Sequence, residues 1–115
     1  MASDENIAVL DDLAEGVVVV RPRGDVDMSR SPDLRMALRA VHERRPTKLV
    51  VDLDQVGYMD SSGLATLVES MRTAKGNKTN MVLCAMNDKV RAIFEIARLH
   101  QFFTIVDSLE DAISA

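Results

Sequence analysis

The chain has 115 residues, 47% of them hydrophobic, and a formal net charge of -4. This length allows one folded domain and excludes a second core, and the acidic balance argues against a general binder of nucleic-acid backbones, which needs a basic face. Cys84 is the only cysteine, so no disulfide can form within one chain and a reducing compartment fits best.

The start of the chain is polar and acidic. Residues 1–5 lack the basic and apolar regions of a signal peptide. No run reaches the roughly 18 apolar residues that a membrane span requires. We therefore expect a cytoplasmic protein made of one domain, residues 1–115, in which residues 1–6 are flexible and which has no membrane partner.

Two strands are predicted in the first part of the chain. The segment Ile7–Leu10 favours a short strand, with turns at Asp11-Asp12 and Glu15-Gly16. Val17–Arg21 is a clearer strand, and its uninterrupted valines indicate that both of its faces are covered or that it is central in the sheet. Pro22 has no amide proton, so strand pairing is expected to end near it.

A helix is predicted next. Ser31, Pro32 and Asp33 combine an N-cap serine, a proline at the first helical position and an acid in the first turn. Its apolar face contains Leu34, Ala37, Leu38 and Val41. Arginines that lie mostly off this face are predicted to be solvated, namely Arg35, Arg39, Arg44 and Arg45. Pro46 ends the helix.

The middle of the chain predicts a strand, a turn and a second helix. Leu49–Leu53 is short, β-branched and apolar apart from Asp52, which favours a buried strand. From Leu64 the apolar spacing becomes i, i+3, i+4 and i+7, which indicates a helix. We expect this helix to end with Gly76 as its C-cap. Between the two elements lies the turn Asp60-Ser61-Ser62-Gly63.

Predicted strands and helices continue to alternate in the last part of the chain. Met81–Ala85 favours a strand, Asn87 or Asp88 caps a helix, Thr104–Val106 is a short strand, and Ser108 caps a terminal helix. The inward side chains of the first of these helices are predicted to be Val90, Ile93, Phe94 and Ala97. The pattern predicts an α/β fold with a mixed, mostly parallel β-sheet of four to five strands and about four α-helices.

The turn at Asp60–Gly63 carries two adjacent hydroxyls at a helix N-terminus. Free backbone N–H groups and the positive end of the helix dipole meet there, so the position suits a phosphate. The simpler interpretation is that Asp60 or Ser61 merely caps the helix. Taken alone, the turn favours capping.

Three stretches in order carry a family resemblance. The first is Leu49–Leu53 followed by Tyr58–Leu64, in which Asp-Ser-Ser-Gly-Leu opens a helix. The second is Gly24–Asp27 followed by Ser31–Leu34, and the third runs through residues 90–112. Together they resemble the anti-sigma factor antagonists, small bacterial members of the STAS domain family, over nearly the whole chain.

The resemblance implies a single STAS-like domain that acts as a regulator and not as an enzyme. Unphosphorylated, it would bind an anti-sigma factor serine protein kinase and free a sigma factor. Phosphorylation of Ser61 would release the kinase, and a PP2C-type phosphatase would reset the switch. ATP and magnesium would belong to the kinase, so the chain needs no cofactor of its own.

The same resemblance assigns roles around Ser61. Asp27 and Asp60 would contribute to the partner surface, and Ser62 would shape the turn. Gly63 would let the partner approach the helix start, because it has no side chain. Where the family has a threonine or small residue after the first loop, this sequence has Arg30 or Ser31, which leaves the contacts of that loop open.

Other reactive side chains give no enzyme site. His42 and His100 have no partner at metal-ligand or triad spacing, and both are predicted to be surface residues. Cys84 lies in an apolar run and is predicted to be a small buried hydrophobe. No Walker or dinucleotide fingerprint is present.

Two alternatives remain. Asp25 and Asp27 follow one strand, and Asp52 and Asp54 lie on or after the next, as in a receiver domain with a magnesium site and an aspartate phosphoacceptor. Against this, the sequence shows Gly-Asp-Val-Asp in place of an acidic pair ending a strand, and no late strand ends in an evident lysine. The other alternative is a STAS scaffold subunit of a larger assembly, such as a transporter-associated complex, without a phospho-switch.

Overall fold

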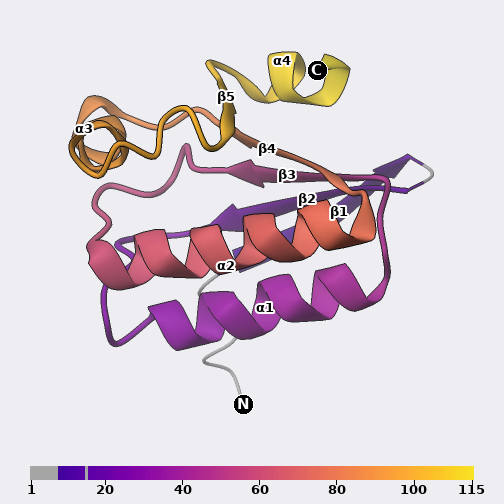
Figure 1. Cartoon of the computed structure of the whole chain (residues 1–115), viewed down its shortest axis with the longest axis horizontal. Coiled ribbons are helices and arrows are strands. Elements are labelled where there is room, and N and C mark those ends of the chain that lie inside the picture. The colour runs from indigo at the N-terminus through magenta and orange to yellow at the C-terminus, as the bar shows by residue number, and fades with distance from the viewer. Residues whose placement is uncertain (1–7, 15) are drawn as a thin grey trace.

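Five strands form one sheet in the order β1-β2-β3-β4-β5 (Figure 1). The computed structural model describes residues 8–14 and 16–115. Its strands are β1 (Ala8–Ala14), β2 (Val17–Pro22), β3 (Lys48–Asp52), β4 (Asn80–Cys84) and β5 (Thr104–Val106). β1 runs antiparallel to β2, and every other neighbouring pair is parallel. The predicted mixed, mostly parallel sheet is confirmed.

The helices cover the sheet unequally. They are α1 (Ser31–Glu43), α2 (Ser61–Asn77), α3 (Asp88–Ile96) and α4 (Leu109–Ser114). α1 and α2 lie side by side on one face, and α4 lies on the other (Figure 1). Both long helices begin at the same end of the molecule, where β2 and β3 finish.

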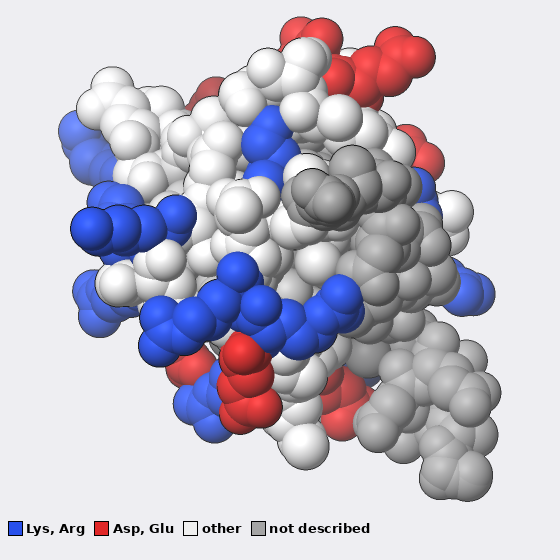
Figure 2. Space-filling model, turned by 90° about the vertical axis from the view of Figure 1, so that its right-hand side faces the viewer, with Lys and Arg blue, Asp and Glu red and all other residues white. Residues whose placement is uncertain are grey.

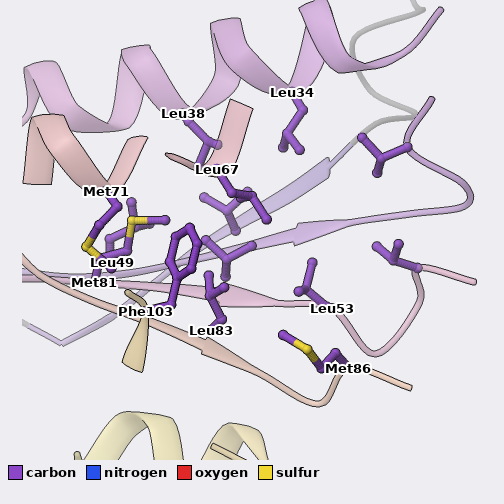
Figure 3. Close-up of a cluster of buried hydrophobic side chains, with 14 of the residues drawn as sticks. Leu34, Leu38, Leu49, Leu53, Leu67, Met71, Met81, Leu83, Met86 and Phe103 are labelled. Atoms are coloured by element: carbon purple, nitrogen blue, oxygen red, sulfur yellow. The ribbon is translucent and has the colours of Figure 1, made fainter. Parts of the chain in front are cut away.

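The alternation of side chains along the strands builds two cores of different size. Val18 and Val20 of β2 face α1 and α2, whereas Val19 faces α4, because successive residues of a strand point to opposite faces. The prediction that β2 is covered on both faces is confirmed. Helix side chains that point toward the sheet in the larger core (Figure 3) include Leu34, Leu38, Leu67 and Met71.

The smaller core depends on α4. Ala112 is the α4 residue that packs fully buried against Val19, Val50 and Val82. The ammonium group of Lys48 donates hydrogen bonds of 2.6–2.9 Å to the carbonyl oxygens at the end of this helix, those of Ala112, Ile113 and Ala115. A lysine that satisfies unpaired carbonyls at a helix C-terminus holds the short helix in place.

The predicted end of the first strand is corrected. β1 continues through Asp11 and Asp12, which pair with Val19 and Val18, so no turn forms there. β1 is an edge strand, where polar residues are tolerated because one side of the strand has no strand partner. The turn comes at Gly16, which has a φ of 77°, while Ile7 and Glu15 lie outside the described residues.

Two helix ends also differ from the prediction. Ser31 is the first residue of α1 and not its N-cap; Arg30 takes that position, because the Asp27 carbonyl already accepts the N–H groups of both residues. α2 runs past Gly76, and its C-cap is Lys78 with a φ of 61°. The next residue, Thr79, anchors this turn by donating its hydroxyl to the Pro46 carbonyl at 2.7 Å.

Other caps match the sequence. Asp60, Asn87 and Ser108 each cap a helix by accepting a backbone N–H two or three residues later, as predicted. Ala97, predicted to point inward, is exposed and follows α3 as its C-cap. Within the described chain, no helix combines the length and the apolar character needed to cross a membrane.

Candidate functional site

The polar turn before α2 is organised by Asp60. Its backbone is extended, with a φ of -102° and a ψ of -172°, and its carboxylate accepts the N–H groups of Ser62 and Gly63 at 2.9 and 3.3 Å. The Ser62 hydroxyl donates to the same oxygen at 2.6 Å. These hydrogen bonds, that of the Ser62 hydroxyl most of all, lower the pKa of Asp60 and keep it ionised.

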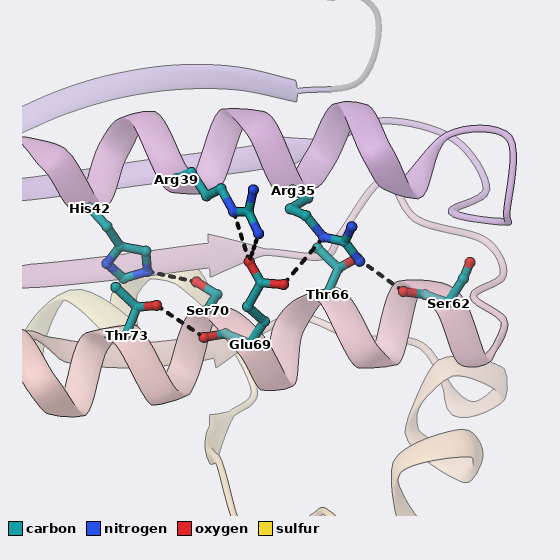
Figure 4. Close-up of polar contacts among 8 residues, drawn as sticks. All are labelled: Arg35, Arg39, His42, Ser62, Thr66, Glu69, Ser70 and Thr73. Atoms are coloured by element: carbon teal, nitrogen blue, oxygen red, sulfur yellow. Dashed lines mark hydrogen bonds and ion pairs between the residues drawn. The ribbon is translucent and has the colours of Figure 1, made fainter.

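The two neighbouring serines differ in what they contact. Ser62 is half-buried and its hydroxyl is held by Asp60. Its carbonyl also accepts a hydrogen bond from Thr66 at 3.0 Å (Figure 4). Ser61 is exposed, and within the described residues its hydroxyl makes no hydrogen bond. Ser62 therefore shapes the turn, as expected, and Ser61 presents the available hydroxyl.

The loop after β2 is joined to this turn by backbone hydrogen bonds. The Val26 N–H donates to the Tyr58 carbonyl at 2.9 Å, and the Asp60 N–H donates to the Val26 carbonyl at 3.1 Å. Val26 and Met59 thereby form a parallel bridge outside the main sheet. The loop that carries Asp27 is fixed against the residues that lead into α2.

Asp27 is close enough to Asp60 for their charges to interact. Its carboxylate accepts the hydroxyl and the N–H of Ser29 at 2.6 and 3.0 Å. The hydroxyl bond is the main reason that the pKa of Asp27 lies below its usual value, while the negative charge of Asp60 opposes this shift. The Met28 N–H in turn helps to lower the pKa of Asp60. Two ionised carboxylates therefore flank the start of α2.

Gly63 has a packing role inside the chain, apart from the partner contact that the resemblance implies for it. The residue is buried. A β-carbon at this position would lie 2.7 Å from the Met59 side chain and 2.9 Å from the Val26 side chain. The missing side chain therefore lets the two loops pack against the first turn of α2.

Arg30 and Ser31 also belong to the packing of the loop. Ser31 is 5% exposed. Gly24 has a φ of 79°, and a β-carbon there would lie 2.6 Å from the Arg30 guanidinium. Only glycine adopts this conformation readily and leaves room for the arginine. Arg30 thus covers the turn at Gly24 that begins the Asp27 loop.

A groove of about 590 Å³ extends from Ser61 along α2, and no pattern in the sequence predicted it. Its lining includes Ser61, Leu64, Ala65, Val68, Arg72 and Leu99, a set that we call the α2 groove. Sequence spacing placed Leu64 and Val68 on a buried face. Val68 is only half-buried, because it lies at the border of that face.

His42 is buried, which corrects its predicted surface position. It is 5% exposed and lies between α1 and α2, with its Nε2 2.7 Å from the Ser70 hydroxyl (Figure 4). Burial lowers the pKa of His42 and outweighs the opposing effect of the hydrogen bond between the ring and Ser70. His100 is exposed, as predicted.

Two of the arginines predicted to be solvated join α1 to α2. Arg39 contacts the Glu69 carboxylate at 2.8 Å, and Arg35 contacts it at 3.3 Å (Figure 4). The prediction missed this pairing because Glu69 is 30 residues from Arg39 in the sequence. Local spacing does not reveal which exposed acid a second helix brings into reach.

The acidic residues of the receiver-like alternative have other contacts. The buried Asp52 carboxylate pairs with Arg21 at 3.2 Å and also accepts the Asp54 N–H at 3.1 Å.

Cys84 is fully buried, as predicted, and desolvation raises its pKa to about 12. Across residues 8–14 and 16–115, no group of three or more His, Cys, Asp or Glu side chains is placed to hold a metal ion.

Comparisons with known proteins agree on one family. The sequence model of the STAS domain matches residues 11–112. The anti-sigma-B factor antagonist of Listeria monocytogenes is 29% identical over 82 residues, which cover 71% of this chain and 72% of that protein. That of Staphylococcus aureus is 25% identical over 91 residues, 79% and 84% of the two chains. The crystal structure of an anti-sigma factor antagonist from Mycobacterium paratuberculosis superposes with a TM-score of 0.86 at 28% identity, covering 98% of this chain and 95% of the other.

Proposed function

The chain belongs to the STAS domain family, and on that premise we propose that it is an anti-sigma factor antagonist whose binding to an anti-sigma serine kinase ends when Ser61 is phosphorylated. The names of its relatives support the class of function. The observation that carries the site is the difference between the two serines. Ser61 offers an exposed hydroxyl, whereas the Ser62 hydroxyl is held by Asp60.

The transfer needs no catalytic group from this chain. The Ser61 oxygen attacks the γ-phosphorus of ATP in the kinase, ADP leaves, and a base of the kinase takes the hydroxyl proton. ATP and magnesium belong to the kinase. A PP2C-type phosphatase hydrolyses the phosphoserine and restores the binding form. In this scheme the protein is a cytoplasmic regulator and not an enzyme.

The fold accommodates the phosphate, and the complex does not. Phosphorylation adds about -1.5 to -2 charge units, and the positive end of α2 offsets part of this charge at the first helical residue. Ser61 is exposed, so the phosphate displaces no core residue. Its cost falls on the surface of the kinase that had contacted a neutral hydroxyl.

A simple estimate shows that this cost suffices for a switch. One like-charge contact at about 5 Å, with an effective dielectric constant of about 20, disfavours the complex by roughly 3 kcal/mol. That free energy corresponds to on the order of a hundredfold in affinity. A protein complex of moderate strength would dissociate.

Mapping the phosphate tests the assignment. The protein is incubated with ATP and each purified anti-sigma kinase of its source organism, and the label is located by peptide mass spectrometry. We expect the label on Ser61, its loss in Ser61→Ala and its retention in the matched variant Ser62→Ala. Label on Ser62 or Asp52, or no label with any of the kinases, contradicts the proposal.

Binding measurements and the chemistry of the label separate the alternatives. Ser61→Ala should keep the kinase bound in the presence of ATP, and Ser61→Glu should bind it more weakly than wild type. A scaffold subunit without a switch would respond to neither change. An acid-stable label that also resists hydroxylamine is phosphoserine, whereas an aspartyl phosphate, as in a receiver, is lost under both treatments.

A further inference from the structure

We propose that the α2 groove is the docking site for an amphipathic helix of the kinase that phosphorylates Ser61, with an acidic residue of that helix placed against Arg72. The inference rests on the proposed function and adds the surface and the chemistry of the partner segment. The proposed contacts between the kinase and this chain extend beyond the turn that carries Ser61 and run along the outer side of α2.

The shape of the groove fits a helix of about three turns. Ser61, Ala65, Val68 and Arg72 follow one another at i, i+4, i+7 and i+11, so they form one stripe along the outer side of α2. At 1.5 Å per residue the stripe is about 16 Å long. Leu99, in the segment after α3, lines the same groove. A helix docked in such a groove inserts side chains at i, i+3 or i+4, and i+7.

The floor of the groove is apolar and partly open to solvent. Leu64 is 7% exposed and packs in the core below, Val68 is half-buried and Ala65 is exposed. The small side chain of Ala65 lets another backbone approach α2 closely. Covering this strip would remove apolar surface from water, which favours association.

The charges of the groove select an acidic partner segment. The carboxylate of Glu69, which also lines the groove, is already neutralised by Arg35 and Arg39. Arg72 is exposed and forms no ion pair with another described residue. The uncompensated charge of the groove is therefore positive and lies at the end away from Ser61. A helix with one apolar face and a carboxylate near one end complements it.

The position of Ser61 identifies the occupant as the kinase. Ser61 lines one end of the groove, so an enzyme that reaches its hydroxyl already covers the first turn of α2. Its surface is then continuous with the rest of the groove. A second copy of this chain seated there would cover Ser61 and block its phosphorylation, which makes self-association the competing outcome.

A matched pair of alanine variants tests the docking site. Ala65→Glu places a charge in the groove, and Ala40→Glu places the same charge at an exposed position of α1. With the kinase that labels Ser61, we expect Ala65→Glu to weaken binding without ATP by about tenfold or more, since a charge is buried in an apolar contact. The kcat/KM for phosphorylation should fall in parallel. Ala40→Glu should leave both unchanged, and thermal unfolding should show both variants folded.

Charge reversal tests the acidic partner segment separately. Arg72→Glu should weaken binding several-fold, with a smaller salt dependence than wild type, because an attractive pair becomes repulsive. Arg45→Glu, just after the end of α1, has the same change in net charge and should bind normally. Equal effects of both reversals would show a general influence of net charge and would overturn the assignment of Arg72.

The outcomes distinguish the two proposals. If Ser61 is labelled but Ala65→Glu binds as wild type does, the docking site is wrong and the phospho-switch stands. If no kinase labels Ser61 in the wild type, both fail. If sedimentation shows a wild-type dimer that Ala65→Glu dissociates, a second copy occupies the groove and the inference is overturned.

Discussion

The polar groups at the start of α2 lie near the surface, whereas those in the middle of the helix are buried. At the start, the Asp60 carboxylate satisfies two N–H groups near the surface, and Ser61 faces solvent. In the middle, Ser70 lies buried against His42 of α1. The start can therefore gain charge without disturbing the interior, whereas a charge in the middle would be placed among buried groups.

The far end of α2 extends this comparison. Figure 2 views the end of the molecule where α1 and α2 finish, and Lys and Arg side chains gather there. The C-cap residues of the two helices are Arg44 and Lys78. Cations at helix C-termini and carboxylates such as Asp60 at N-termini both complement the helix dipoles. The proposed phosphate would join the end that already tolerates negative charge.

Gly63 tests the contrast between the start and the middle of α2 most strongly, because it lies at the start of the helix but packs among interior side chains. Gly63→Ala places a methyl group 2.7–2.9 Å from Met59 and Val26, so we expect a loss of about 1–3 kcal/mol in the free energy of unfolding. Urea denaturation measures it.

The same helix contains the control for that substitution. A β-carbon at Gly76 meets nothing within 4 Å, so Gly76→Ala should stabilise the protein by about 0.5–1 kcal/mol through helix propensity. If Gly63→Ala lowers the free energy of unfolding and Gly76→Ala raises it, the loss at position 63 comes from close packing and not from helix propensity. An unchanged stability of Gly63→Ala would show that the loops move aside freely.

Asp60 is the polar residue that caps the exposed start of α2. Asp60→Ala removes the cap of α2, and we expect a loss of about 1 kcal/mol. Because hydrogen bonds lower the pKa of Asp60 from 3.8, its stabilising effect is present above that pH and lost as the carboxylate is protonated below it. The difference in stability between wild type and Asp60→Ala should therefore shrink in acid. A constant difference from neutral pH into acid would contradict this role.

His42 makes the stability of the buried contact between α1 and α2 depend on pH. Burial lowers its pKa below 6.5 in the folded protein, so the unfolded chain binds the proton more readily and stability falls as the pH drops below that value. We expect a lower free energy of unfolding at about pH 5.5 than at about pH 7.5. The lowered pKa values of Asp27 and Asp60 act only in stronger acid.

The two histidines provide a matched pair for this measurement. His42→Gln removes the titrating ring between α1 and α2, and His100→Gln removes the exposed one. The loss of stability between these pH values should diminish in His42→Gln and persist in His100→Gln. The reverse result would locate the pH dependence outside the α1–α2 contact.

Sequence patterns predicted a structural feature correctly where the hydrogen bonds of that feature join residues close together in the chain. The caps at Asp60, Asn87 and Ser108 each join residues two or three positions apart, and the valines of β2 fill both faces of a strand as their pattern indicated. The end of α2 was misplaced because Thr79, which follows the C-cap Lys78, is held by a contact with Pro46. The two residues of that contact are 33 positions apart, so no pattern in the sequence near Thr79 indicates it.

Local patterns in the amino-acid sequence were sufficient to predict the alternating fold, the polar turn before α2 and a pair of candidate hydroxyls in that turn. The folded arrangement was needed to show which serine hydroxyl is available, why glycine fits position 63, that His42 is buried, and that a groove extends from Ser61. These properties depend on which segments distant in the chain come into contact, because exposure and packing are set by neighbours in space. Periodicity and capping report only the neighbours along the chain.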